Sequence, residues 1–169
     1  MTNLHESYVT EFSRQDVSIY PSWLQSLKRR SIKHFTNVGM PIARRGNERW
    51  KYTNVRGIAR SVFKISEPYI PCSTERESIT ENVFWDESWI NLVFIDGHYS
   101  RELSAVPSEV DCELANPLSI DLNRNQLSIK NILASQAEIE TDDGFASLNT
   151  AFFSDGAFVN IPSHVQVKT

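Results

Sequence analysis

A short stretch near the end of the chain, between Phe145 and Pro162, constrains the fold more than any other feature. Phe145, Leu148 and Phe152 recur at i, i+3 and i+7, which is the spacing of one face of a helix. Gly156 stands where a helix end favours a residue that tolerates positive φ. The residues that follow are apolar and end at a proline, which cannot donate a ladder hydrogen bond. The stretch therefore predicts a compact helix, a tight Asp-Gly exit and a strand that has only begun.

The first half of the chain predicts helices. Residues 4–12 fit a short amphipathic helix, and residues 23–38 follow helical spacing until Gly39, with a proline two positions beyond, stops them. Residues 54–62 fit a shorter helix capped by an asparagine, and residues 67–71 form a proline-containing break. Four cations of the second helix are expected largely on its polar side: Lys28, Arg29, Arg30 and Lys33.

The second half predicts strands. Residues 89–95 form an apolar run, Asp96-Gly97 is a strong hairpin signal, and residues 98–103 form the returning strand. Residues 110–114 alternate weakly and add a third strand, whereas residues 129–133 favour a short helix or turn. The predicted fold class is therefore α+β.

We divide the chain into a helical N-terminal subdomain over residues 1–88 and a β-rich segment over residues 89–169. The composition, 40% hydrophobic and 22% charged, is ordinary for a soluble globular protein. No apolar run reaches the roughly 18–20 residues of a membrane span, and the N-terminus does not resemble a signal peptide. The two cysteines make no disulfide framework. We therefore expect a cytoplasmic protein.

The formal charge of −4 conceals a strong polarity. Residues 28–64 contain eleven Lys or Arg and one acidic residue, Glu48, so this segment carries +10 and the remainder carries −14. The segment is expected either to bind an anionic partner or to dock against the acidic part of its own chain. The sequence leaves both alternatives open.

No pattern in the sequence predicts catalysis or metal binding. Cys72 and Cys112 stand alone, and the four histidines have no ligand spacing. The Gly-x-Ser-x-Gly and phosphate-loop motifs are both absent. We therefore expect no enzyme activity, no metal site and no bound cofactor in this chain.

The basic segment supplies the candidate binding residues: Arg44, Arg45, Arg49, Trp50 and Lys51. Cations interleaved with aromatic rings can bind phosphates and stack on bases. The alternatives are that the aromatic rings pack between helices, or that the segment binds a protein. The acidity of the rest of the chain argues against nucleic acid.

Three motifs, in order, carry a resemblance to a known family. Residues 39–41 with 48–53 are similar to a Gly-x-Pro … Glu-x-Trp-Lys-Tyr-Thr element, and residues 94–104 are similar to a Val-Asn-Gly-x-x-Ser … Leu-Ser hairpin. Residues 148–162 resemble the segment leading into the core of the SufB/SufD family of iron–sulfur cluster assembly proteins. The first two motifs are typical of SufD. Family members are more than twice as long, so the chain is interpreted as an N-terminal fragment.

The resemblance implies a non-catalytic scaffold subunit of the SUF complex, acting with SufB and the ATPase SufC. It implies that the β-rich part leads into a right-handed parallel β-helix, mostly outside this chain. The contacts with SufB and SufC, and the residues that handle the cluster, are then expected downstream. An isolated fragment would expose a strand edge and is expected to self-associate. The rival interpretation is a free-standing anion- or nucleic-acid-binding module that uses residues 28–64.

Overall fold

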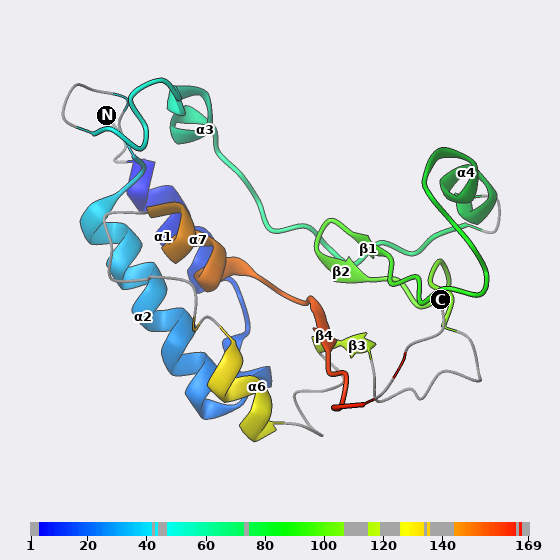
Figure 1. The fold of residues 1–169 in the computed structure, drawn as a ribbon. Coiled ribbons are helices and arrows are strands. Elements are labelled where there is room, and N and C mark those ends of the chain that lie inside the picture. The colour runs from blue at the N-terminus through cyan, green and yellow to red at the C-terminus, as the bar shows by residue number, and fades with distance from the viewer. Residues whose placement is uncertain are drawn as a thin grey trace. The chain divides into compact units, whose positions relative to one another are not determined.

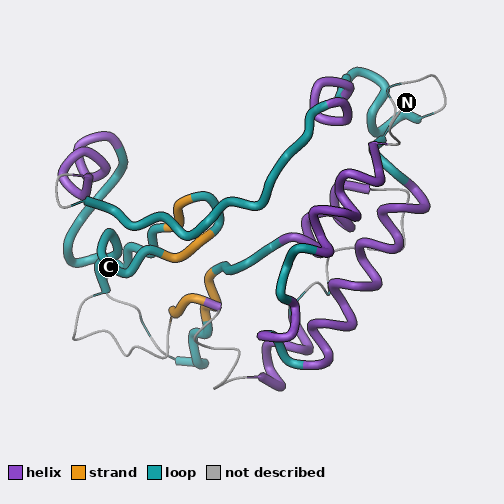
Figure 2. The backbone as a smooth tube through the Cα atoms, turned by 180° about the vertical axis from the view of Figure 1, so that it is seen from behind, coloured by secondary structure: helices purple, strands orange, loops and turns teal. Residues whose placement is uncertain are grey.

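The chain forms two compact units, drawn in Figures 1 and 2. Unit 1 comprises Met1–Ile65 and Lys130–Phe153, and unit 2 comprises Ser66–Ile129 and Ser154–Thr169. The division into subdomains at residue 88 stays a prediction. The computed structural model describes residues 4–41, 43, 47–72, 75–106, 115–118, 126–133, 135, 144–164 and 166.

Unit 1 is helical. Its described elements are α1 (Leu4–Ser13), the 3₁₀ turn η1 (Val17–Ile19), α2 (Ser22–Val38), α3 (Arg56–Arg60), the end of α6 (Gln126–Ile132) and α7 (Gly144–Phe152). Figure 1 shows α1, α2 and α7 side by side. Apolar side chains from these three helices and η1 form one core: Tyr8, Phe12, Val17, Ile32, Phe35 and Ala151.

The second predicted helix is confirmed as α2. Pro21, with φ −55°, stands at its N-cap, and the helix ends at Gly39, whose φ of 69° lies in the region that favours glycine. The Gly39 nitrogen donates to the Phe35 carbonyl over 2.7 Å. Leu24 and Phe35 are fully buried on its inner face. Local signals therefore set both ends of α2.

The helix predicted from residue 145 is confirmed as α7, which packs antiparallel to α2. Its first residue, Gly144, lies against Gly39 at the end of α2, and Ala151 near its end lies against Lys28 near the start of α2. Its fully buried positions are small residues, such as Ser147 and Ala151, whereas Leu148 and Phe152 are only partly buried against the core. Small side chains let the two backbones approach closely.

The expectation for Gly156 is wrong. The helix ends at Phe152, and Gly156 is not among the glycines with positive φ. Its nitrogen donates to the Asp155 carboxylate over 2.9 Å, and its carbonyl accepts from the Leu118 nitrogen over 2.7 Å. Gly156 therefore connects to a strand rather than closing the helix.

The short helix predicted after residue 54 is present as α3. The N-cap is Val55, which makes no side-chain cap hydrogen bond, so the predicted cap at Asn54 is wrong by one residue. The Asn54 side-chain oxygen instead accepts from the backbone nitrogen of Arg56 over 3.0 Å, in a turn that leads into the helix. Val55 is buried, but Ile58 is 43% exposed, and Val62 lies beyond the end of the helix. The apolar side of α3 is thus buried only at its start.

The predicted hairpin is confirmed in unit 2. Strands β1 (Phe94–Ile95) and β2 (His98–Tyr99) pair antiparallel, with Phe94 opposite Tyr99. Asp96 and Gly97 both have positive φ, 50° and 85°, which is the signature of a type I′ turn. The strands are shorter than the sequence pattern suggested, although a bridge between Asn91 and Ala105 continues the pairing.

The strand after Gly156 is confirmed as β4 (Ala157–Val159), which pairs antiparallel with β3 (Ala115–Pro117). The strand predicted at 110–114 lies outside the described residues. Helix α4 (Glu75–Asn82) was not expected, because its residues have no apolar periodicity. Helices with small antiparallel sheets make the described residues an α+β fold, as predicted.

Candidate functional site

Trp50 of the basic segment packs against α7. Trp50 lies in a turn over residues 47–53. Its backbone nitrogen donates to the Asn47 carbonyl oxygen over 3.2 Å, and the Thr53 backbone nitrogen donates to the Trp50 carbonyl oxygen over 3.1 Å. The Trp50 ring lies 5.4 Å from the Phe145 ring, centroid to centroid, with a 39° tilt. Trp50 is half-buried, so one of the predicted binding residues contributes to packing within unit 1.

The cations beside Trp50 face outward. Lys51 makes an exposed ion pair with Glu48 at 3.5 Å and lies 5.2 Å from the centre of the Tyr52 ring. Such surface pairs contribute little to stability. Arg49 is exposed, and Arg44 and Arg45 lie outside the described residues. The turn therefore presents Arg49 and Lys51 to solvent while Trp50 anchors it.

Lys28 corrects the expectation for the polar side of α2. Its side chain is fully buried, because residue 28 lies one helical turn after Leu24 and one before Ile32, on the inner face. Its ammonium group donates to the carbonyl oxygens of Ala151, at 3.2 Å, and Phe153. The Phe153 ring centre lies 4.0 Å away. Helical spacing alone would have placed this lysine inside.

Lys28 is the most perturbed titratable group described. Burial lowers its pKa from 10.5 to about 8. It donates to carbonyls at the end of α7, where the helix dipole favours positive charge. No carboxylate among the described residues forms an ion pair with it. Lys28 therefore joins α2 to the C-terminus of α7.

The motif residues lie at contacts between elements. In unit 1, Gly39 lies against Gly144 and Trp50 lies against Phe145. In unit 2, the Ser154 hydroxyl donates to the carbonyl oxygen of Gly97 in the hairpin turn over 2.9 Å. Residues of the first two motifs thus contact α7 or Ser154, which follows α7 in the chain.

The other candidate ligands are scattered. Cys72 is exposed, and Cys112 lies outside the described residues. The His34 ring nitrogen Nδ1 lies 2.9 Å from the Ser147 hydroxyl, and the His98 Nε2 lies 3.0 Å from the Ser66 carbonyl. Among the described residues, no group of three His, Cys, Asp or Glu side chains could hold a metal ion.

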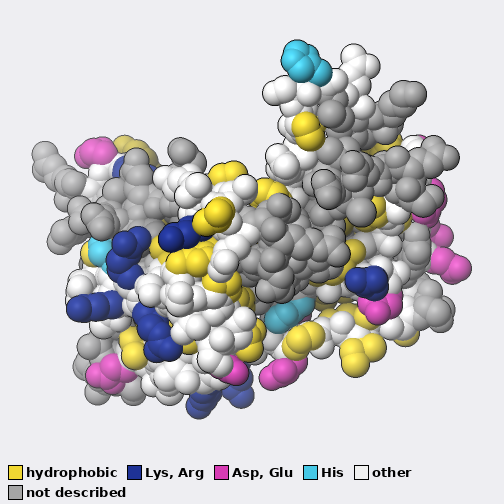
Figure 3. Space-filling view, turned by 90° about the horizontal axis from the view of Figure 1, so that it is seen from below, with side chains coloured by type: hydrophobic (Ala, Val, Ile, Leu, Met, Phe, Trp, Pro, Cys, Tyr) yellow, Lys and Arg dark blue, Asp and Glu magenta, His cyan; other side chains and the backbone are white. Residues whose placement is uncertain are grey.

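Charge divides between the two units. Unit 1 contains 13 Lys or Arg and 8 Asp or Glu, for a net +5, and unit 2 contains 4 basic and 13 acidic residues, for a net −9. Figure 3 shows several Lys and Arg side chains gathered on one exposed face of unit 1, at the left of the view. None of the described helices combines the length and hydrophobicity of a membrane span.

The fold and these contacts define an α+β region whose sequence motifs serve as packing points between its elements. Residues 2–169 match the family described as the SufBD protein N-terminal region, so the chain belongs to this family. The resemblance to the SufB/SufD family is thereby confirmed. The search of curated proteins and the search of solved structures each gave no match.

Proposed function

We propose that this chain is the N-terminal part of a SufD-like, non-catalytic scaffold subunit of a SUF iron–sulfur cluster assembly complex. The family match over residues 2–169 carries the proposal. The SufD-like Trp-Lys-Tyr-Thr element around Trp50 and the Asp96-Gly97 hairpin favour SufD over SufB. The complex would be cytoplasmic.

In this proposal, the chain leads into a right-handed β-helix downstream. SufB-like and SufC-like subunits would contact the downstream regions, and cluster chemistry would take place there. The fragment itself would bind no cofactor and catalyse no reaction. The non-catalytic part of the proposal is supported by the sequence, in which no motif assembles a nucleophile, acid or base.

Deletion of the gene tests the cellular role. We expect the activity of iron–sulfur dehydratases to fall under iron limitation, while enzymes without clusters keep their activity. Expression of the complete gene from a plasmid should restore the dehydratases. Unchanged dehydratase activity in the deletion strain would contradict the proposal.

The exposed cations of the 47–53 turn suggest a second role, the docking of an acidic partner. Trp50 is fixed against Phe145, so Arg49 and Lys51 are presented on a supported turn. Replacing Arg44, Arg45 and Arg49 together by Glu should weaken association with a SUF partner, whereas Arg14→Glu, in the same unit, should not. Unchanged association with every SUF partner would remove this role.

The alternative of a free-standing anion- or nucleic-acid-binding module rests on residues 28–64 and the net +5 of unit 1. A filter-binding titration with single- and double-stranded nucleic acid tests it. Salt-dependent affinity would favour this module. If no such affinity is found, the nucleic-acid-binding alternative is excluded and only the scaffold proposal remains.

A further inference from the structure

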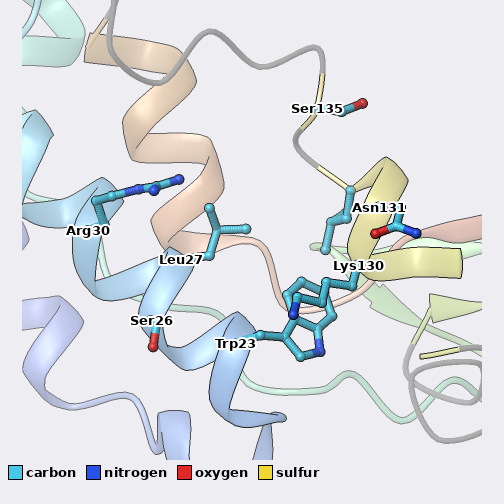
Figure 4. Close-up of a pocket in the computed structure, with 8 residues that line it drawn as sticks. Trp23, Ser26, Leu27, Arg30, Lys130, Asn131 and Ser135 are labelled. Carbon is cyan, nitrogen blue, oxygen red and sulfur yellow. The ribbon is translucent and has the colours of Figure 1, made fainter. Parts of the chain in front are cut away.

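A pocket of about 420 Å³ lies in unit 1 between the first half of α2 and the end of α6 (Figure 4). This volume lies within the range of small-molecule sites. The pocket belongs to none of the contacts that bear the family motifs. Six of the described residues that line it carry the argument: Trp23, Leu27, Arg30, Lys130, Asn131 and Leu133.

The pocket wall is cationic. Arg30 comes from α2 and Lys130 from α6, and none of the described residues that line the pocket is a carboxylate. Within the described part of the chain, neither cation has a hydrogen bond or an ion pair. Figure 4 shows the Lys130 side chain extending from α6 toward Trp23. Both cations therefore line one pocket, and no carboxylate in the described part of the chain lines it with them.

Trp23 adds a hydrogen-bond donor without an acceptor. Its indole nitrogen Nε1 is buried and has no partner among the described residues. An indole N–H can only donate, and leaving a buried donor unsatisfied costs about 1–3 kcal/mol. Buried tryptophan N–H groups usually find a partner. A residue that lines the pocket thus carries a buried donor that has no acceptor within the described part of the chain.

The remaining walls differ in character. Leu27 and Leu133 supply apolar surface beside the indole, and Asn131 supplies an amide. Two cations suit a phosphate or carboxylate, because charge-assisted hydrogen bonds to such groups are strong. The apolar wall suits a carbon body of one ring. The volume is larger than a bare inorganic ion would need.

We propose that this pocket binds a small organic anion, with its phosphate or carboxylate held by Arg30 and Lys130 and its carbon body against Trp23, Leu27 and Leu133. This inference goes beyond the scaffold role and does not depend on it.

The indole N–H of Trp23 supplies a direct readout. In the ¹⁵N-labelled full chain, Trp23→Phe assigns its resonance, and phenyl phosphate, benzoate and inorganic phosphate are the probes. We expect phenyl phosphate or benzoate to move the Trp23 signal saturably, with a Kd on the order of 1 mM or below. The titration of the unmodified chain decides by itself whether the anion binds near Trp23.

Matched variants locate the site. Arg30→Gln and Lys130→Gln should each weaken binding about tenfold, the loss of one charge-assisted contact. Arg29→Gln, an exposed cation on the same helix that does not line the pocket, should leave binding unchanged. The indole signal of Trp50, which does not line the pocket, should keep its wild-type position in each unliganded variant, which shows that the fold of unit 1 is intact.

Three results would overturn the proposal. The first is a shift that does not saturate or that sodium chloride reproduces, since this indicates screening alone. The second is equal weakening by Arg29→Gln, which indicates a diffuse positive field. The third is binding of inorganic phosphate as tight as that of phenyl phosphate, which would show that the apolar wall does not contribute to binding.

Discussion

The buried ammonium group of Lys28 lies 3.2 Å from the carbonyl oxygen of Ala151, and this bond joins positions 123 residues apart. It connects the first half of α2 to the end of α7, the helix that leads toward β4. A cation in this place satisfies carbonyls that α7 leaves open at its end. Lys28 therefore has a structural role in unit 1.

Lys28 predicts a rise in stability with pH. Its pKa is about 8 in the folded chain and near 10.5 when unfolded, so between these values the unfolded chain binds the extra proton. The free energy of unfolding should rise by up to about 1.4 kcal/mol per pH unit in that window. Denaturant unfolding between pH 7 and pH 9.5 measures the slope.

The Lys28→Met variant should lose this rise, whereas Lys33→Met, on the exposed side of α2, should keep it. Burial raises the pKa of Tyr8, so the opposite trend is expected only above about pH 10, where free tyrosine ionises. Equal slopes in wild type and Lys28→Met would show that the lysine is not buried as described.

Gly144→Ala should separate α2 from α7. A Cβ at residue 144 would lie 1.8 Å from the carbonyl oxygen of Gly39, which is backbone and cannot give way easily. We expect a loss of stability of at least about 1–3 kcal/mol in thermal or denaturant unfolding. Gly57→Ala is the matched control, because nothing lies within 4 Å of the added atom, and it should be neutral or slightly stabilising. Equal effects of the two changes would argue against the close contact.

The contact between Trp50 and Phe145 should appear as an energetic coupling. Trp50→Leu and Phe145→Leu should each destabilise unit 1, and a double-mutant cycle should give a coupling of about 0.5–1.5 kcal/mol. Tyr52→Leu, a change at a ring that is 89% exposed, should be nearly neutral and uncoupled from Phe145. A coupling energy near zero between Trp50 and Phe145 would show that the two rings are not in contact.

Gly97→Ala should loosen the β1–β2 hairpin, because residue 97 has φ 85° and a Cβ there is strained whatever the space around it. Hydrogen exchange should become faster in residues 91–105. Gly156→Ala, at a residue without positive φ and with open space for the Cβ, should leave exchange in this segment unchanged. Unaltered exchange in Gly97→Ala would contradict the type I′ turn.

The helices and turns that the sequence predicts correctly are those whose signals lie within a few neighbouring residues. The apolar period of α2 ended by Gly39, and the Asp96-Gly97 turn, were both readable from neighbouring residues. Helix α4 has no apolar period, so it was not expected. There, the Cys72 nitrogen donates to the Glu75 carboxylate over 2.7 Å, which supports the start of the helix.

The long-range contacts could not be predicted in this way. The charge of Lys28 favours the polar side of α2, although its spacing from the buried Leu24 favours the inner face. Its acceptors at Ala151 and Phe153 and the pairing of β3 with β4 depend on how distant segments meet. The same holds for the pocket, whose two cations stand one hundred positions apart, at 30 and 130. A sequence read one window at a time contains no signal for such pairs.

Affinity purification tests the scaffold assignment most directly. The gene should be tagged at its own locus, and the proteins that co-purify under iron limitation should be identified and quantified. We expect SufB-like and SufC-like subunits in fixed ratio to the tagged chain, retained after a moderate-salt wash. Recovery of the tagged chain without either subunit would contradict it.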